Sequence, residues 1–185
     1  MDKPLADKVA IVTGAPEGIG AATARRLSDH GAAVMIHYNS RREPAEALAA
    51  DLRAKGGRAE TVQADLLHAD APQRIIGATL QAFGRMDILV NNAGLAQRAL
   101  LADVTPQFVQ DHFQVNAFAV LYLIQAAAPH FPPEGGAIVN VTTNLCQNPA
   151  MSMVVYSAAK AAVENMTLGF AKELARIFAG TAPGV

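Results

Sequence analysis

Tyr156 and Lys160 are four residues apart in a stretch with helical periodicity, so both side chains should leave the same face of one helix. A free tyrosine phenol has a pKa of about 10 and holds its proton at neutral pH, whereas a nearby ammonium favours the phenolate. Such a pair can serve as a general acid/base. The same spacing also arises by chance, with the tyrosine half-buried and the lysine in solvent, so the pair alone does not decide.

A glycine-rich segment near the N-terminus predicts a nucleotide site. The β-branched run 8–13 is followed by Gly14, Gly18 and Gly20, and then by residues that favour a helix. In such a strand, turn and helix, Gly14 permits a tight turn and Gly18 lets backbone N–H groups approach a pyrophosphate. Gly20 lets the helix lie close to the sheet, with its N-terminus facing the anion. We therefore expect nucleotide binding rather than a purely structural turn.

Several segments, taken in order, resemble the signature of the short-chain dehydrogenase/reductase family. They are Thr13-Gly14-x-x-x-Gly18-x-Gly20, Asn91-Asn92-Ala93-Gly94, Asn116 and Tyr156-x-x-x-Lys160. The resemblance extends from about Lys8 to about Ala175, and the glycine spacing is similar to that of the compact oxidoreductase branch. It implies a Rossmann-type fold and hydride transfer between a nicotinamide cofactor and a carbonyl or secondary alcohol.

The resemblance also implies roles for catalytic side chains. Tyr156 would exchange a proton with the substrate oxygen, and Lys160 would lower the tyrosine pKa and bind the nicotinamide ribose. Asn116 would orient a water that continues the proton relay. Because Asn116 lies in an apolar run, its amide should also have a hydrogen-bond partner.

One catalytic position departs from the family pattern. Family members usually have a serine thirteen residues before the tyrosine, where this chain has Thr143. Threonine keeps the hydroxyl donor and acceptor while adding a methyl group. We therefore assign Thr143 to the substrate oxygen, with Thr142 or Asn144 as alternatives if the register shifts by one residue.

The second predicted strand ends without an acidic residue, which bears on the choice between NAD(H) and NADP(H). In NAD-selective relatives an acid at that place binds the adenosine ribose. Here the place falls near Tyr38 and Asn39, and Ser40 and two arginines follow. A guanidinium there can pair with a 2′-phosphate through two hydrogen bonds. We therefore favour NADP(H), with NAD(H) as the alternative.

Two observations oppose this preference. Glu17, immediately before Gly18, places a carboxylate where it would repel the phosphate. Arg41 and Arg42 could also be the solvated start of a helix.

Further cofactor contacts follow from the resemblance. Asp65, after the third predicted strand, resembles the residue that contacts adenine, although it could equally cap a helix. The stretch 91–94 ends a buried strand, at the edge where doubly wound sheets bind ligands, and a structural role is its alternative. The predicted cofactor-binding residues are Gly14, Glu17, Gly18, Ile19, Gly20, Tyr38, Asn39, Ser40, Arg41, Asp65, Leu66, Asn92, Ala93, Gly94, Tyr156 and Lys160. We expect no metal site.

Strand and helix patterns alternate along the chain, which predicts an α/β fold with a doubly wound parallel sheet in a single domain, 1–185. The expected strands are Val9–Thr13, Ala33–Tyr38, Arg58–Gln63, Ile88–Asn91 and Ala137–Thr142. The expected helices are Ile19–His30, Pro44–Lys55, Pro72–Phe83, Pro106–His130 and Val155–Phe178. Family members usually continue with further strands and a substrate lid. We therefore expect either a fragment or a shortened protein, in which the fifth strand is an exposed edge unless another chain or segment covers it.

Composition excludes several classes of protein. The 185 residues carry a formal net charge of -1, which gives no electrostatic case for binding nucleic acid or an anionic membrane. The longest apolar stretch, 117–128, is too short to span a bilayer, and the N-terminus has no apolar signal region. Cys146 is the only cysteine, so an internal disulfide is impossible. A cytoplasmic protein is the simplest interpretation.

Two classes of function remain at this stage. The leading one is an oxidoreductase acting on a small-molecule carbonyl compound, with segments 95–98 and 145–154 bordering the substrate. The alternative is a nucleotide-binding module or regulatory subunit that no longer turns over, which the missing lid and Thr143 would favour.

Apolar residues on the last two long helices predict association. They are Phe108, Phe113, Phe118, Leu121 and Leu123 on the first, and Val163, Met166, Phe170 and Leu174 on the second. In relatives these helices pair across a two-fold axis, so the resemblance implies a homodimer or homotetramer. The alternative is that these residues line the core of a monomer.

Overall fold

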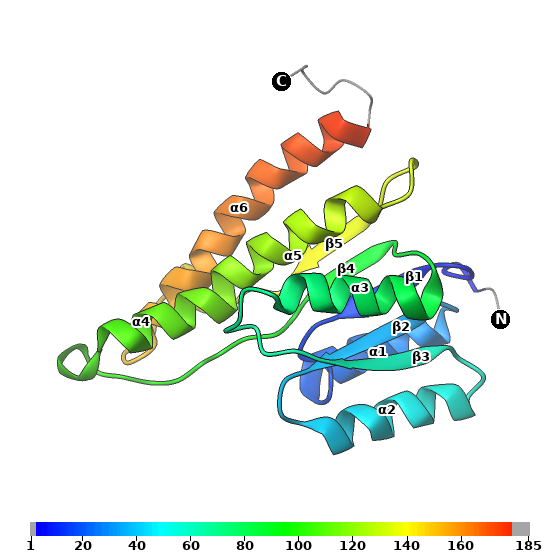
Figure 1. The fold of residues 1–185 in the computed structure, drawn as a ribbon. Coiled ribbons are helices and arrows are strands. Elements are labelled where there is room, and N and C mark those ends of the chain that lie inside the picture. Colours follow the sequence, from blue (N-terminus) through cyan, green and yellow to red (C-terminus); the bar gives the residue numbers. More distant parts are fainter. Residues whose placement is uncertain (1–2, 179–185) are drawn as a thin grey trace.

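A five-stranded parallel sheet runs through the molecule in the computed structural model, which describes residues 3–178 (Figure 1). The strands are β1 (Val9–Val12), β2 (Ala33–Tyr38), β3 (Ala59–Gln63), β4 (Ile88–Asn91) and β5 (Ala137–Asn140). Their order in the sheet is β3-β2-β1-β4-β5, and every neighbouring pair is parallel. The predicted doubly wound α/β fold is confirmed.

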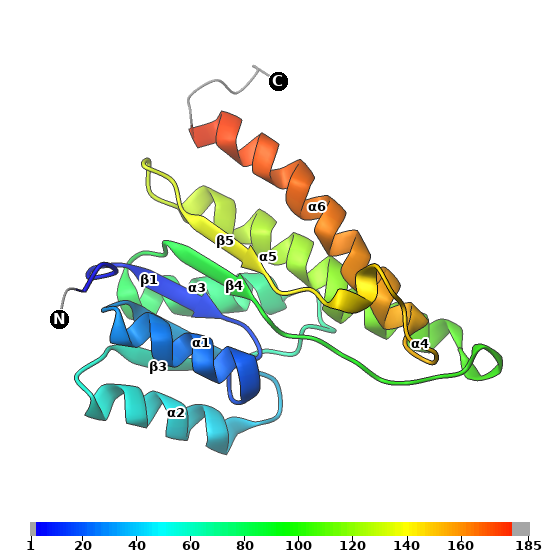
Figure 2. The ribbon, with the colours of Figure 1, turned by 180° about the vertical axis from the view of Figure 1, so that it is seen from behind.

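Helices cover both faces of this sheet. They are α1 (Gly18–Asp29), α2 (Arg42–Ala54), α3 (Ala71–Phe83), α4 (Pro106–Phe113), α5 (Ala119–Ala127) and α6 (Val154–Phe178). Helices α1 and α2 lie on one face, whereas α3 and α5 lie on the other (Figures 1 and 2). Helix α6 packs against α4 and contacts β5, and its apolar side chains pack against the same cluster as those of α3 and α5 (Figure 2).

The long helix expected at 106–130 is interrupted. Between α4 and α5 the chain forms a π-helix, Gln114–Phe118, and after α5 it ends in a 3₁₀ turn, Ala128–His130. Two further 3₁₀ turns, Leu101–Asp103 and Asn144–Cys146, lie in the connections. A π-helical turn inserts an extra residue into an otherwise continuous helix, and such turns are frequent at functional sites.

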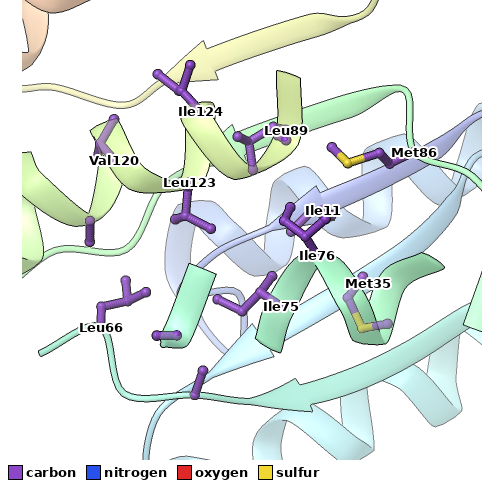
Figure 3. Close-up of a cluster of buried hydrophobic side chains, with 14 of the residues drawn as sticks. Ile11, Met35, Leu66, Ile75, Ile76, Met86, Leu89, Val120, Leu123 and Ile124 are labelled. Atoms are coloured by element: carbon purple, nitrogen blue, oxygen red, sulfur yellow. The ribbon is translucent and has the colours of Figure 1, made fainter. Parts of the chain in front are cut away.

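Alternation along the strands builds one apolar cluster on each face. Ile11 and Met35 point toward α3 and α5, whereas their neighbours Val12, Val34 and Ile36 point toward α1 and α2. Figure 3 shows the first cluster, in which side chains of the sheet meet those of α3 and α5. Strands β1 and β2 are buried along their whole length because both of their faces are covered.

Strand β5 differs from the inner strands. Within residues 3–178 it pairs only with β4, and the Val139 side chain is 50% exposed. Beside it, α5 and α6 border an apolar groove of about 340 Å³ that Ile138, Phe170 and Leu174 help to line. In the described part of the chain, β5 is therefore an uncovered edge, as expected.

Candidate active site

The turn between β1 and α1 depends on close backbone approach. Gly14 has a φ of +60°, and a Cβ atom there would lie only 2.8 Å from the Cα of Ala93. A Cβ atom on Gly20 would lie 2.6 Å from both the Asn92 Nδ2 and the Gly14 carbonyl oxygen. Larger residues at 14 and 20 would therefore push the turn away from the end of β4.

Residues after β4 hold this turn in place. The Asn92 side-chain amide donates to the carbonyl oxygens of Thr13 and Gly14, both at 2.9 Å. The Thr13 hydroxyl in turn accepts the N–H groups of Asn92 and Ala93, both at 3.0 Å. Asn92 therefore has the structural role that was the alternative to cofactor contact for the stretch 91–94.

A cavity of about 420 Å³ opens at the C-terminal ends of the strands. Predicted cofactor residues that line it are Gly14, Glu17, Tyr38, Asn39, Ser40, Arg41, Asp65, Leu66, Asn92, Ala93 and Gly94; Pro16, His37, Leu67, Leu95 and Val115 complete the wall. Gly18, Ile19 and Gly20 do not line the cavity, because they form the first turn of α1, where the Ile19 side chain is 66% exposed.

The two arginines after β2 have different surroundings. Arg41 lines the cavity and forms an ion pair with Glu17 across its mouth. Arg42 is the first residue of α2 and pairs with Glu46 one turn further along, at 2.7 Å. Arg41 is the N-cap residue of α2 and Arg42 its first residue, so the solvated start of a helix describes both, but only Arg41 also lines the cavity. The Glu17 carboxylate already faces a cation, which offsets its repulsion of a phosphate.

Asp65 also lies on the cavity wall. Its Oδ1 accepts the Leu67 N–H at 3.0 Å within a short turn. Helix α3 begins only at Ala71, with Asp70 in the N-cap position. The alternative that Asp65 caps the following helix is therefore wrong.

Asn116 lies in the π-helix and is completely buried. Its Nδ2 donates to the carbonyl oxygens of Leu95, at 2.8 Å, and His112, at 2.9 Å, while its Oδ1 accepts the Leu95 N–H at 3.0 Å. The expected partner is thus present. Both N–H groups of the amide are used, so the side chain fixes the segment after β4 and has no free donor for a water.

Lys160 lies beside Gly94, which lines the cavity. A Cβ atom on Gly94 would lie 3.7 Å from the Lys160 Nζ and 3.1 Å from the Asn116 Oδ1. The Lys160 side chain is only 2% exposed, and its Nζ donates to the Val141 carbonyl at 2.9 Å. Burial lowers the pKa of Lys160, and the nearby Cys146 thiol partly opposes this shift. Lys160 and Asn116 are thus brought to one end of the cavity.

Tyr156 is half-buried on α6, four residues before Lys160. Burial raises the pKa of Tyr156, the Cys146 thiol raises it further, and a hydrogen bond with the Thr143 side chain lowers it. The predicted lowering of the tyrosine pKa by Lys160 is therefore wrong for this structure. The physical reason is that desolvation of the phenol dominates, while the Lys160 ammonium is turned toward the Val141 carbonyl.

The three residues considered for binding the substrate oxygen differ in their contacts. Thr143 is hydrogen-bonded to Tyr156, and its Oγ1 also accepts the Leu145 N–H at 3.3 Å. Thr142 instead donates to the Glu164 carboxylate at 3.1 Å. Asn144 is exposed and begins a 3₁₀ turn. The geometry favours Thr143, whose role in substrate binding stays a prediction.

Two buried histidines were missed by sequence reasoning. His112, on α4, donates from Nδ1 to the Phe108 carbonyl at 2.7 Å and accepts the Gln97 N–H on Nε2 at 3.2 Å. His37, on β2, contacts the glycine turn. His37 is a polar residue within an apolar strand, whereas His112 stands among the polar residues Gln110, Asp111 and Gln114, and neither pattern identifies the partners of the ring.

Residues 3–178 include no helix that is both long enough and apolar enough to cross a membrane. Over the same residues, no three His, Cys, Asp or Glu side chains gather in a way that could hold a metal ion.

Comparison with known proteins places this geometry in context. The model of the family described as short chain dehydrogenase matches residues 8–185. An uncharacterized oxidoreductase of Methylorubrum extorquens is 40% identical over 171 residues, which cover 92% of this chain and 68% of that protein. A 3-oxoacyl-[acyl-carrier-protein] reductase of Synechocystis sp. is 38% identical over 174 residues, with 92% and 70% coverage.

A solved structure shares both fold and sequence with the chain. The short chain dehydrogenase from Burkholderia cenocepacia, in complex with NADP, superposes with a TM-score of 0.90 at 41% identity, covering 93% of this chain and 70% of that one. The chain thus spans about two thirds of the length of the curated relatives it matches.

Proposed function

The chain belongs to the short-chain dehydrogenase family of NAD(P)-dependent oxidoreductases, and we propose that it uses NADP(H) to reduce the carbonyl group of a small molecule. The observation that carries the proposal is the meeting, at Gly94, of the nucleotide cavity with Lys160 and Asn116. The NADP complex of the Burkholderia relative and the name of the Synechocystis relative support the choice of cofactor and of a keto substrate.

When bound, NADPH would supply the hydride that reduces the carbonyl carbon. The Tyr156 hydroxyl would donate its proton to the carbonyl oxygen, so that the ketone becomes a secondary alcohol. The Thr143 hydroxyl, which is hydrogen-bonded to Tyr156, would bind the same oxygen and fix its direction. Lys160, whose Nζ lies close to Gly94, would hold the ribose next to the nicotinamide.

A raised pKa makes the Tyr156 phenol a weaker proton donor, although it also keeps that donor protonated. Because burial disfavours the phenolate, the phenol keeps its proton at neutral pH. A protonated phenol is the form required of a general acid in carbonyl reduction.

The direct test is to titrate NADPH into the purified chain and then add a panel of ketones. We expect saturable binding followed by loss of the reduced-nicotinamide absorbance with at least one ketone. Tight binding without any absorbance loss across a broad panel would instead favour a nucleotide-binding module.

Cofactor preference gives a prediction in which Arg42 serves as the matched control. Arg41→Ala should weaken NADPH binding and leave NADH binding unchanged, because only the 2′-phosphate would meet the guanidinium. Charged hydrogen bonds contribute about 1.5–3 kcal/mol. Since Arg41 is 60% exposed, solvent screens its contact with the phosphate. We therefore expect the loss of NADPH binding free energy to lie near the lower limit of this range.

Calorimetry with both cofactors measures these affinities. Arg42→Ala should bind both like the parent, because Arg42 faces Glu46. Equal weakening of NADPH and NADH by Arg41→Ala would show that this residue does not read the phosphate.

Assembly is a further prediction. The apolar residues singled out on the long helices separate into two groups, since Leu123 and Val163 are buried in the core whereas Phe118 is 44% exposed. Tyr122 and Leu168 are also exposed on α5 and α6. We therefore expect at least a homodimer at micromolar concentration by light scattering, and a smaller particle for Leu168→Lys. A parent chain that stays a clean monomer would contradict the prediction.

A further inference from the structure

His37 lies on β2, directly behind the glycine turn. Its side chain is only 2% exposed, and its Nδ1 lies 3.2 Å from the backbone nitrogen of Gly14. Its Nε2 lies 3.0 Å from the carbonyl oxygen of Ala64, just after β3. The His37 backbone carbonyl also accepts the Ala15 N–H at 3.1 Å. One residue therefore connects the glycine turn to the ends of two neighbouring strands.

The partners of the imidazole fix its protonation state. The Gly14 N–H can only donate, so Nδ1 must present its lone pair; the Ala64 carbonyl can only accept, so Nε2 must carry the hydrogen. A doubly protonated ring would turn an N–H toward the Gly14 N–H and break this contact.

The surroundings favour the neutral ring. Burial lowers the pKa of His37, and the hydrogen bond to Ala64 and the nearby Asp65 carboxylate oppose this shift only in part. The other charged groups on the cavity wall are Glu17 and Arg41, which pair with each other. The imidazole is therefore a neutral acceptor for Gly14 at neutral pH.

Both backbone polar groups of Gly14 are held by side chains from other strands. His37 accepts its N–H, and Asn92 donates to its carbonyl oxygen at 2.9 Å. A glycine has no side chain of its own to restrict the backbone, so such anchors determine the shape of the turn. Gly14 and His37 both line the cavity that would receive the cofactor.

We propose that His37 is a positioning residue of the nucleotide site, which holds Gly14 in the turn conformation that receives the cofactor pyrophosphate. The proposal rests on the proposed function, because the ligand concerned is NADP(H). It also assigns the Gly14 N–H to His37, so the pyrophosphate must be bound by other N–H groups of the turn and of α1.

Two amide replacements separate this role from simple filling of the core. His37→Asn places an amide oxygen close to the position of Nδ1, where it can still accept the Gly14 N–H. His37→Gln reaches the position of Nε2 and can keep only the contact with Ala64. We expect the Asn variant to bind NADPH within about threefold of the parent and the Gln variant to bind about tenfold more weakly, as loss of one hydrogen bond predicts.

The Gln variant should also raise the KM for NADPH by about tenfold, and comparison of KM with kcat separates weaker cofactor binding from a general loss of activity. Thermal unfolding shows whether each variant is folded. If the parent binds NADPH tightly and the Gln variant binds equally well, the role of His37 is overturned and the proposed function stands. If the folded parent binds neither NADPH nor NADH, the proposed function fails as well.

If the variants do not fold, ¹⁵N NMR of His37 in the parent chain decides. A neutral ring protonated on Nε2 from about pH 6 to about pH 8 would support the proposal. A ring protonated on Nδ1, or one that titrates within this range, would overturn it.

Discussion

Replacing Tyr156 by phenylalanine should reduce ketone-dependent turnover by about 100- to 10,000-fold, the range that general acid catalysis contributes. The ring keeps its volume on α6, and only the hydroxyl that protonates the substrate oxygen is removed. Affinity for NADPH should stay within about twofold of the parent, because the turn around Gly14 and the Lys160 ammonium hold the cofactor. Steady-state oxidation of NADPH and calorimetry measure the two effects separately.

Tyr122→Phe is the matched control. Tyr122 is 39% exposed on α5 and does not line the cavity, so its variant should turn over normally. Near-normal turnover of the Tyr156→Phe variant would remove Tyr156 from the proposed mechanism.

Lys160→Met should lower activity and raise stability at the same time. NADPH binding should weaken by about tenfold, and turnover at limiting NADPH should fall with it, because the ammonium that would bind the ribose is lost. The free energy of unfolding at neutral pH should nevertheless rise by about 1 kcal/mol, since a charge that is 2% exposed is replaced by an apolar chain.

The sign of the stability change follows from the lowered pKa of Lys160. Its ordinary value is 10.5, and burial lowers it in the folded protein. The stability associated with neutral lysine is present above 10.5 and is lost as pH falls through the folded-state pKa. The parent therefore carries more of the burial cost at neutral pH than in alkaline solution, where the advantage of the Met variant should shrink.

Urea unfolding at neutral and alkaline pH tests this trade-off. Lys172→Met, which alters an exposed lysine on the same helix, should leave both activity and stability close to those of the parent. An unchanged NADPH dissociation constant in Lys160→Met would exclude the ribose role. A less stable Met variant at neutral pH would contradict the burial cost.

The sheet could be predicted closely because its strands are short, apolar and covered on both faces. Ala33–Tyr38 and Ile88–Asn91 have the predicted bounds. The last strand was predicted two residues too long, since it ends at Asn140. Val141 still donates to the Asn91 carbonyl, but its own carbonyl is turned to the Lys160 ammonium. The apolar pattern of the sequence does not show that the Val141 carbonyl bonds to the Lys160 side chain, or that the strand ends there.

The π-helix could not be predicted from periodicity. Its extra residue shifts the helical periodicity over only one turn. The apolar residues on either side still follow a helical pattern, so the sequence predicts one continuous helix. The conformation brings Asn116 to the Leu95 segment, a contact between residues far apart in sequence.

Sequence reasoning singled out the candidate site residues that belong to an ordered signature. It missed residues that contact the site only through backbone groups distant in the sequence. The glycines, the stretch 91–94 and the Tyr156–Lys160 pair have characteristic spacings. His37 and His112 have none, because their partners are main-chain groups that only the tertiary fold brings close. The direction of the Tyr156 pKa shift was missed for a related reason, since desolvation depends on packing.

The strand order has a consequence for the chain as it leaves the ribosome. Strand β1 lies between β2 and β4, so one of its edges can pair as soon as Ala33–Tyr38 is made, whereas the other must wait for Ile88–Asn91. Until then that edge is open to wrong partners. Asn92, which holds the Gly14 carbonyl, is synthesised later still. The glycine turn, although it is made early, therefore gains this anchor only after Asn92 has been synthesised, so the cofactor cannot meet a finished turn while β1, β2 and β3 are forming.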